Sequence, residues 1–140
     1  MIVLDASAMV KLVVEETGSK VAREIYKNEL SDGERIIVPN IALPETLNTI
    51  WKYHALKKQL NSREYEECVN DAISIFMKLE KMPDEEIAKY SSIIASRYKI
   101  PVYDSLYTAT SMLNNAPLLT FDAPIARKAK EIGLLLVELG

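Results

Sequence analysis

Short runs of apolar residues alternate with longer amphipathic stretches along this chain, a pattern typical of strands that alternate with helices. Strand-like runs occur at 2–4, 36–38, 102–103, 118–119 and 134–137. Helical patterns cover 8–14, 19 to the turn at 31–33, 40–55, 62–79, 84–98, 105–113 and 123–132, with Gly133 ending the last helix. The alternation predicts an α/β fold in which helices cover both faces of an open parallel sheet.

The stretch 62–98 holds two long helical patterns with no apolar strand between them. A break at Met82-Pro-Asp-Glu separates them, and Asp84 is the expected cap of the second helix. We expect these helices to form a hairpin that protrudes from the sheet layer between the second and third strands. The chain of 140 residues contains no repeat, linker or low-complexity segment, so the sequence predicts one domain over 1–140.

Four acidic residues lie at or near the ends of the predicted strands. Three aspartates follow the first, third and fourth strands, and one glutamate lies in the first turns of the helix after the second: Asp5, Asp104, Asp122 and Glu45. The carboxyl ends of parallel strands open into a common crevice. Carboxylates that converge there repel one another and favour a hard cation such as Mg²⁺ or Mn²⁺. Such an ion supports cleavage of phosphodiesters.

Each acid taken alone also has a structural interpretation. The three aspartates precede helices, where Asp is a preferred N-cap. Glu45 is a first-turn acid that the helix dipole favours. It shares a polar stripe with Asn48 and Lys52, opposite the apolar stripe of its helix. That polar stripe could face solvent or a cleft, and the pattern does not choose between them.

Small polar and basic residues accompany the acids. Ser7 comes two residues after Asp5 and Thr120 two before Asp122, where both could hold metal-bound water, with Asn48 as a further supporting residue. Ser7 is equally explained as a helix cap and Thr120 as a strand end. Four cations are candidate phosphate contacts, although each alone is also explained as a solvated surface charge: Lys11, Lys52, Arg127 and Lys128.

The composition excludes several other classes of protein. A net charge of −3 argues against a basic protein that coats nucleic acid. One cysteine and one histidine cannot build a disulfide, a structural zinc site or a credible Ser-His-Asp set. The lone Cys68 favours a reducing, cytoplasmic setting. No apolar run reaches the length of a membrane span, so we expect no membrane partner.

Four segments, taken in order, resemble the acidic motifs of the PIN domain family. They are IVLDASAMVKL at 2–12, PNIALPETLN at 39–48, VYDSLYTA at 102–109 and LTFDAPIARKA at 119–129. The small form most resembles the VapC toxins of toxin–antitoxin modules. The resemblance implies a metal-dependent ribonuclease whose Asp5, Glu45, Asp104 and Asp122 bind Mg²⁺ or Mn²⁺. It also implies an antitoxin whose flexible basic segment docks at the acidic cleft.

Other interpretations remain open at this point. The resemblance implies a homodimer, for which Ile73, Phe76 and Met77 offer apolar surface, although these residues also fit a core. PIN nucleases also serve RNA processing, so a stand-alone processing nuclease is an alternative. A catalytically inactive protein-binding α/β domain, with the acids as caps, is another. A receiver-like phosphoacceptor would need paired acids after the first strand, where only Asp5 stands.

Overall fold

In a computed structural model that describes residues 1–140, four parallel strands form one sheet in the order β3-β2-β1-β4. The strands are β1 (Ile2–Leu4), β2 (Ile36–Pro39), β3 (Glu80–Met82) and β4 (Leu118–Leu119). At the centre, Val3 of β1 pairs with Ile37 of β2 on one side and with Leu118 of β4 on the other. The open parallel sheet flanked by helices is therefore confirmed.

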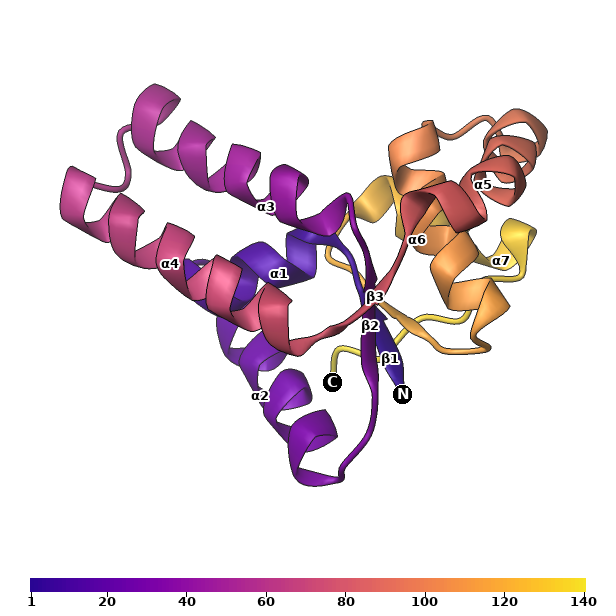
Figure 1. Cartoon of the computed structure of the whole chain (residues 1–140), viewed down its shortest axis with the longest axis horizontal. Coiled ribbons are helices and arrows are strands. Elements are labelled where there is room, and N and C mark those ends of the chain that lie inside the picture. The colour runs from indigo at the N-terminus through magenta and orange to yellow at the C-terminus, as the bar shows by residue number, and fades with distance from the viewer.

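Helices cover both faces of the sheet, as Figure 1 shows with the sheet seen edge-on. On one face lie α1 (Ala6–Val13), α2 (Ser19–Ser31), α3 (Ala42–Trp51), the π-helical segment η1 (Lys52–Leu56) and α4 (Ser62–Lys78). On the other lie α5 (Asp84–Tyr98), α6 (Val102–Leu113) and α7 (Ala123–Ile132). None of these helices combines the length and the apolar character that crossing a membrane requires.

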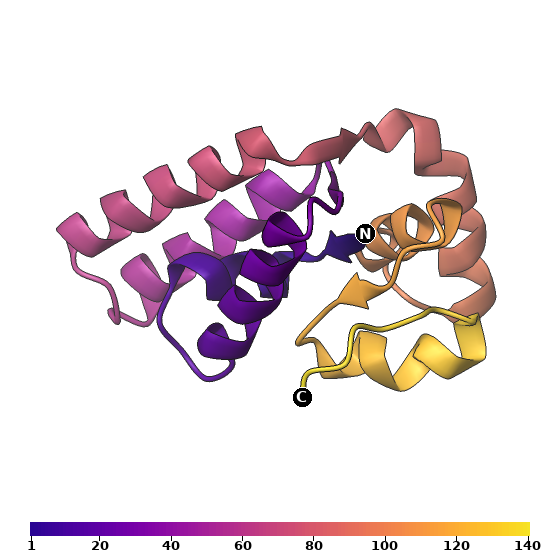
Figure 2. The same cartoon turned by 90° about the horizontal axis from the view of Figure 1, so that it is seen from below.

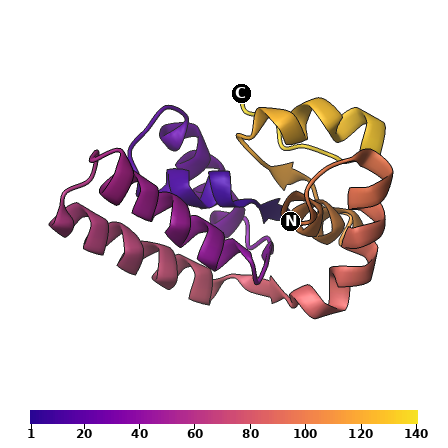
Figure 3. The ribbon, with the colours of Figure 1, turned by 90° about the horizontal axis from the view of Figure 1, so that it is seen from above.

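A helical hairpin protrudes from the sheet layer, but it is not formed by the expected residues 62–98. Its arms are α3 with η1 and, packed alongside, α4 (Figures 1 and 3). The expected hairpin at 62–98 is interrupted by β3, which pairs with β2 and separates α4 from α5 on opposite faces of the sheet (Figure 2). The sequence concealed β3 because this edge strand is Glu-Lys-Met, with Glu80 exposed, and lacks an apolar run.

Four smaller expectations also need correction. Asp84 is the first residue of α5 rather than its cap, which is Pro83, and its Oδ1 accepts the backbone N–H of Ile41 at 3.3 Å. Val102 and Tyr103 are not a strand but the exposed first residues of α6, which begins after the extended Pro101. Residues 134–137 form no strand and contribute one isolated bridge, from Leu136 to Leu118. Helix α1 starts at Ala6, two residues earlier than expected.

The apolar core holds the strand ends rigidly in place. The largest cluster of buried residues joins β1, β2 and β4 to helices from both faces, and it includes Tyr107 of α6. Strands β1 and β2 are buried along their whole length, as parallel strands covered on both faces are. A second cluster, including Val10, Ile50 and Ala72, packs α1, α3 and α4 together at the base of the hairpin. The carboxyl ends of β1, β2 and β4 therefore emerge from a fixed frame.

Candidate active site

Four helices begin at the carboxyl-terminal edge of the sheet, and each carries one of the candidate acids. Asp5 directly follows β1 as the N-cap of α1, and Asp122 is the N-cap residue of α7. Glu45 and Asp104 lie in the first turns of α3 and α6. Charge repulsion from the other three acids helps to raise the pKa of Asp104. The structure thus brings the other three acids within electrostatic reach of Asp104.

Asp5 is the most enclosed of the four, with 3% of the residue exposed. Its Oδ1 accepts hydrogen bonds from Ser7 Oγ at 2.6 Å and from the backbone N–H of Ala8 at 3.0 Å, and its Oδ2 accepts one from Thr120 Oγ1. Burial nevertheless raises the pKa of Asp5 to about 6, because these three bonds offset only part of the desolvation. Asp5 is therefore a fixed carboxylate whose charge is costly.

Asp104 lies in a different environment. Its side chain is half-buried and accepts no hydrogen bond from the protein. Burial, followed by repulsion from Asp122, Glu45 and Asp5, raises the pKa of Asp104 to about 6. No donor holds this carboxylate, so it is free to reorient toward a cation.

Glu45 is oriented by a tyrosine from the opposite face of the sheet. Tyr107 Oη donates a hydrogen bond to Glu45 Oε1 at 2.5 Å, and the tyrosine is 2% exposed. Burial and the neighbouring Glu45 raise the pKa of Tyr107 well above its usual range, so its hydroxyl remains a donor. The sequence analysis missed Tyr107, because it lies 62 residues from Glu45 and no local pattern links the two.

The capping interpretation of the acids applies to Asp5 alone. Asp5 caps α1 through the N–H of Ala8, whereas Ser7, the expected cap, does not. Asp122 occupies the N-cap position of α7 without making a side-chain capping bond. Asp104 lies inside α6, whose N-cap is Pro101. Two of the three aspartates are therefore not explained by helix capping.

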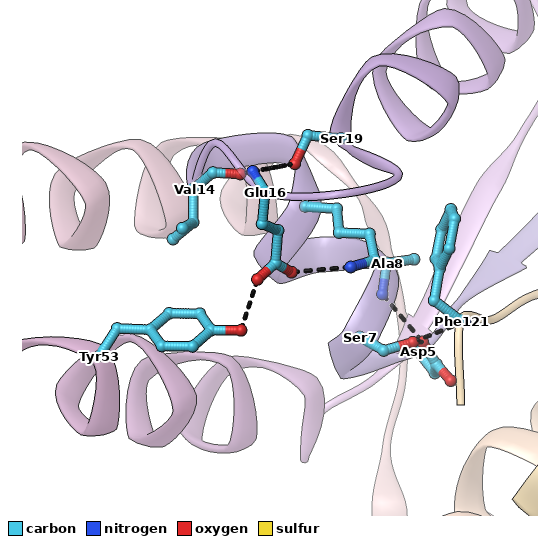
Figure 4. A network of polar contacts seen from close by, with 9 residues as sticks. Asp5, Ser7, Ala8, Val14, Glu16, Ser19, Tyr53 and Phe121 are labelled. Carbon is cyan, nitrogen blue, oxygen red and sulfur yellow. Dashed lines mark hydrogen bonds and ion pairs between the residues drawn. The ribbon is translucent and has the colours of Figure 1, made fainter. Parts of the chain in front are cut away.

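The small polar residues hold the acids rather than standing free for water. Ser7 Oγ donates to Asp5 and accepts the backbone N–H of Phe121 at 2.9 Å, as Figure 4 shows. Thr120 Oγ1 donates to Asp5 and accepts the N–H of Asp122 at 3.0 Å. These bonds join the end of β1 to the end of β4. Asn48 is exposed on α3 and makes no side-chain hydrogen bond.

The four candidate cations have different surroundings. Lys11 lies beside this network, where its Nζ pairs with Glu16 at 2.8 Å and lies 5.1 Å from the centre of the Phe121 ring. Lys128 instead donates to the backbone oxygen of Tyr98 at 2.7 Å. Lys52 and Arg127 are exposed and form no ion pair. None of the ion pairs of the protein involves any of the four acids.

The donor set suits a hard divalent cation in chemistry and in charge. All four groups offer carboxylate oxygens, the ligands that Mg²⁺ and Mn²⁺ prefer, and no cation of the protein compensates them. Their side chains are too far apart to bind one ion together, since no three acidic side chains stand close enough to hold it. The unbonded Asp104 and the non-capping Asp122 are the side chains with freedom to close that gap. The only histidine, His54, stacks on Tyr65 in the hairpin and belongs to no such group.

Comparison with known proteins gives one family and several structures. The chain matches the PIN domain family over residues 2–131. It is similar in structure to a chain of a toxin–antitoxin complex from Klebsiella pneumoniae, with a TM-score of 0.68 and 17% identity over 100% of this chain and 98% of that chain. It is also similar to VapBC2 from Rickettsia felis bound to a DNA fragment from their promoter, with a TM-score of 0.67 and 18% identity over 99% and 98% of the two chains.

A third similar structure is PAE2754 from Pyrobaculum aerophilum, with a TM-score of 0.65 and 16% identity over 90% of this chain and 77% of that one. No curated protein sequence matches the chain. At these identities the structural similarities establish the fold. The expected family resemblance is confirmed by the match over nearly the whole chain.

Proposed function

Since the chain belongs to the PIN domain family, we propose that it is a metal-dependent endoribonuclease that hydrolyses RNA phosphodiester bonds. The observation that carries this proposal is that acidic side chains from four helix starts lie near enough for three of them to repel Asp104, while no cation of the protein is paired to any of them. A structural set of helix caps would not leave Asp104 and Asp122 unbonded while raising the pKa of Asp104.

The four acids have separate tasks in this proposal. Asp5, Glu45, Asp104 and Asp122 would hold Mg²⁺ or Mn²⁺, which supplies activation of the attacking water and stabilisation of the leaving oxygen. Ser7 and Thr120 keep the Asp5 carboxylate in one orientation. Tyr107 does the same for Glu45. Asp104 accepts no hydrogen bond, so a cation can bind its carboxylate without breaking a contact. The cation would also offset the repulsion from the neighbouring acids.

The experiment for this activity is cleavage of single-stranded RNA by the purified protein with Mg²⁺ or Mn²⁺ present. We expect cleavage with either ion, loss of cleavage on addition of a chelator, and recovery when excess ion is restored. Protein made with Asp104→Asn, purified in the same way, controls for contaminating ribonuclease. Cleavage that survives the chelator, or that equals wild type in this variant, would contradict the assignment.

We propose further that the protein is the toxin of a toxin–antitoxin pair. Two of the similar structures are described as a toxin–antitoxin complex and as VapBC2, and this supports an antitoxin partner here. The uncompensated carboxylates favour a partner segment with arginine, whose fork pairs bidentately with a carboxylate. Glu45→Lys should therefore weaken both metal binding and capture of such a segment.

The toxin proposal is tested in cells. Expression of the chain alone should slow bacterial growth, and the protein isolated from its own cells should carry a small, tightly bound partner. Normal growth together with a consistently partner-free native protein would favour a stand-alone processing nuclease.

We also propose that the protein is a homodimer in the cytoplasm. On α4, Ile73 is half-buried and Met77 is 73% exposed, while Phe76 packs against the main core. A monomer by light scattering at high protein concentration would reject it.

A further inference from the structure

A pocket of about 250 Å³ opens beside the candidate active site, between α1, α3 and the loop that follows α1. Polar, basic and aromatic residues dominate its lining: Ser7, Val10, Lys11, Glu16, Thr49, Tyr53 and Phe121. Ser7 connects the pocket to the acids, because its hydroxyl bonds Asp5 and the backbone of Phe121 (Figure 4). The pocket is therefore the immediate neighbour of the site where cleavage is proposed.

Two rows of side chains lead from the acids into this pocket. On α1, Ser7 and Lys11 are four residues apart and so lie on one face of the helix. On the facing α3, Glu45 and Thr49 have the same spacing, and Tyr53 follows in η1. Each row begins at or next to a candidate metal ligand. A polymer whose scissile phosphate lies at the acids would extend directly over these residues.

The far end of the pocket carries a set of donors arranged around one carboxylate. Glu16 Oε1 accepts from Lys11 Nζ at 2.8 Å, and Glu16 Oε2 accepts from the Tyr53 hydroxyl (Figure 4). A lysine point charge and a hydroxyl donor are also the groups that bind a phosphate oxygen. Lys11 Nζ also lies over the Phe121 ring, 5.1 Å from its centre, so the ring helps to hold the lysine at the pocket.

The loop that carries Glu16 lies close to the pocket without depending on that side chain. Gly18 has φ +90°, and a Cβ there would lie 3.1 Å from the Phe121 ring and 3.3 Å from Lys11 Cδ. The backbone N–H of Glu16 donates to Ser19 Oγ at 3.0 Å, and that hydroxyl donates to the oxygen of Val14 at 2.7 Å. The Glu16 carboxylate can therefore leave while the loop backbone stays anchored.

We propose that this pocket binds the RNA nucleotide next to the cleaved bond, with Lys11 and Tyr53 donating to its phosphate and Glu16 occupying that position until RNA displaces it. The inference rests on the ribonuclease activity proposed above. It adds an RNA-binding subsite in which the Glu16 side chain competes with the RNA phosphate. Glu16 is a carboxylate in the place of a phosphate, so it lowers the affinity of the free protein for RNA.

Binding is measured in Asp104→Asn protein, which should bind RNA without cutting it. The probe is a fluorescein-labelled single-stranded oligoribonucleotide of mixed sequence, followed by fluorescence anisotropy. Glu16→Gln should lower the Kd about fivefold, the scale that a partly exposed ion pair contributes. Lys11→Met should raise the Kd, and adding Glu16→Gln to Lys11→Met should then lower the Kd by less than it does with Lys11 present, because part of the effect of Glu16 comes from its competition for Lys11.

The matched control is Glu15→Gln, which removes the same charge from the same loop. Glu15 is 78% exposed along its side chain and pairs with Arg23 at 2.9 Å, away from Lys11. Its replacement should leave the Kd nearly unchanged. Equal tightening by Glu15→Gln would show a general charge effect and overturn the subsite, as would tightening by Glu16→Gln that is undiminished without Lys11.

Two experimental outcomes distinguish failure of this inference from failure of the proposed function. Wild-type protein that fails to cleave RNA contradicts the ribonuclease assignment. Wild-type protein that cleaves RNA, while Glu16→Gln folds with an unchanged melting temperature and leaves both the Kd and the KM unaltered, overturns the subsite alone.

Discussion

The two sides of the candidate site hold their carboxylates in contrasting ways. On the side formed by β1 and β4, Asp5 is buried and accepts three hydrogen bonds from Ser7, Ala8 and Thr120. On the side formed by α6, Asp104 is half-buried and accepts none. The pKa is raised to about 6 in both cases, by burial foremost. At Asp5 the hydrogen bonds oppose that rise, whereas at Asp104 three neighbouring acids add to it.

The difference shows that two carboxylates can reach the same pKa with different capacities to respond. Asp5 is positioned before any ligand arrives, and moving it would break bonds that tie β1 to β4. Asp104 has no such bonds, and its charge is disfavoured until a cation compensates it. A metal site built from one fixed and one mobile carboxylate would combine a defined position with the ability to close.

The largest expected effect is on the mobile side. Asp104→Asn should reduce RNA cleavage by about 10²–10³-fold, the scale of losing one electrostatic contact in a catalytic site. The melting temperature should stay the same or rise, because the variant removes a repelled charge and breaks no hydrogen bond. Cleavage rates and thermal melts of both proteins test this. A clearly lower melting temperature would show that Asp104 has a structural partner after all.

The pH dependence of stability comes next in size. Both acids have folded-state pKa values near 6, above the ordinary 3.8, so the folded protein binds protons more readily than the unfolded chain. Their contribution to stability is therefore present in acid and is lost as the pH rises from about 4 to about 6. In metal-free buffer the melting temperature should fall over this window for wild type, and fall less for Asp104→Asn. Identical slopes for the two proteins would contradict the raised pKa of Asp104.

Thr120→Val tests the fixed side. It removes the donor to Asp5 and leaves the N–H of Asp122 without its partner, which should lower stability by about 1–3 kcal/mol. Loss of this bond raises the pKa of Asp5 further, so the acid limb of the pH–rate profile for cleavage should move to higher pH.

A matched substitution on the other side is Thr108→Val. Thr108 donates to the backbone oxygen of Asp104 at 3.1 Å and leaves the carboxylate untouched. The pH–rate profile should therefore stay in place in this variant. An equal shift in both variants would remove the distinction between the two sides.

The smallest effect is expected at Glu45. Tyr107→Phe removes the hydroxyl that orients this carboxylate and should lower the free energy of unfolding by about 0.5–1.5 kcal/mol, measured in urea. Tyr103→Phe makes the same change on a residue that is 59% exposed and has no hydrogen-bond partner, so it should have almost no effect. Equal losses from the two variants would show that the Tyr107 bond contributes nothing.

The sequence predicted where the acids lie better than it predicted the elements that carry them. Asp5 and Asp122 follow apolar strands that the pattern reveals directly. Asp104 was expected after a strand and lies instead in the first turn of α6. Asp104 still lies at the expected edge of the sheet, because a helix that starts at this edge places its first turn in the same crevice as a strand end.

The parts that sequence reasoning missed depend on long-range packing. Strand β3 pairs only with β2, and its charged residues give no apolar run to recognise. The sequence pattern indicates a core position for Tyr107, and only the packing of α6 across the sheet brings its hydroxyl to Glu45. Glu16 and Tyr53 read as surface residues and meet because the loop after α1 folds toward η1.

The bond between Asp5 and Thr120 joins residues 115 positions apart, and this separation governs when the site comes into being. As the ribosome releases the chain from its amino terminus, β1 and Asp5 emerge long before β4 and Asp122. Parallel pairing over such a distance is among the slower steps of folding, since loop closure precedes any gain from the contact. A nascent chain therefore carries an incomplete acidic centre through most of its synthesis. The proposed hydrolytic activity would therefore become available only after β4 docks.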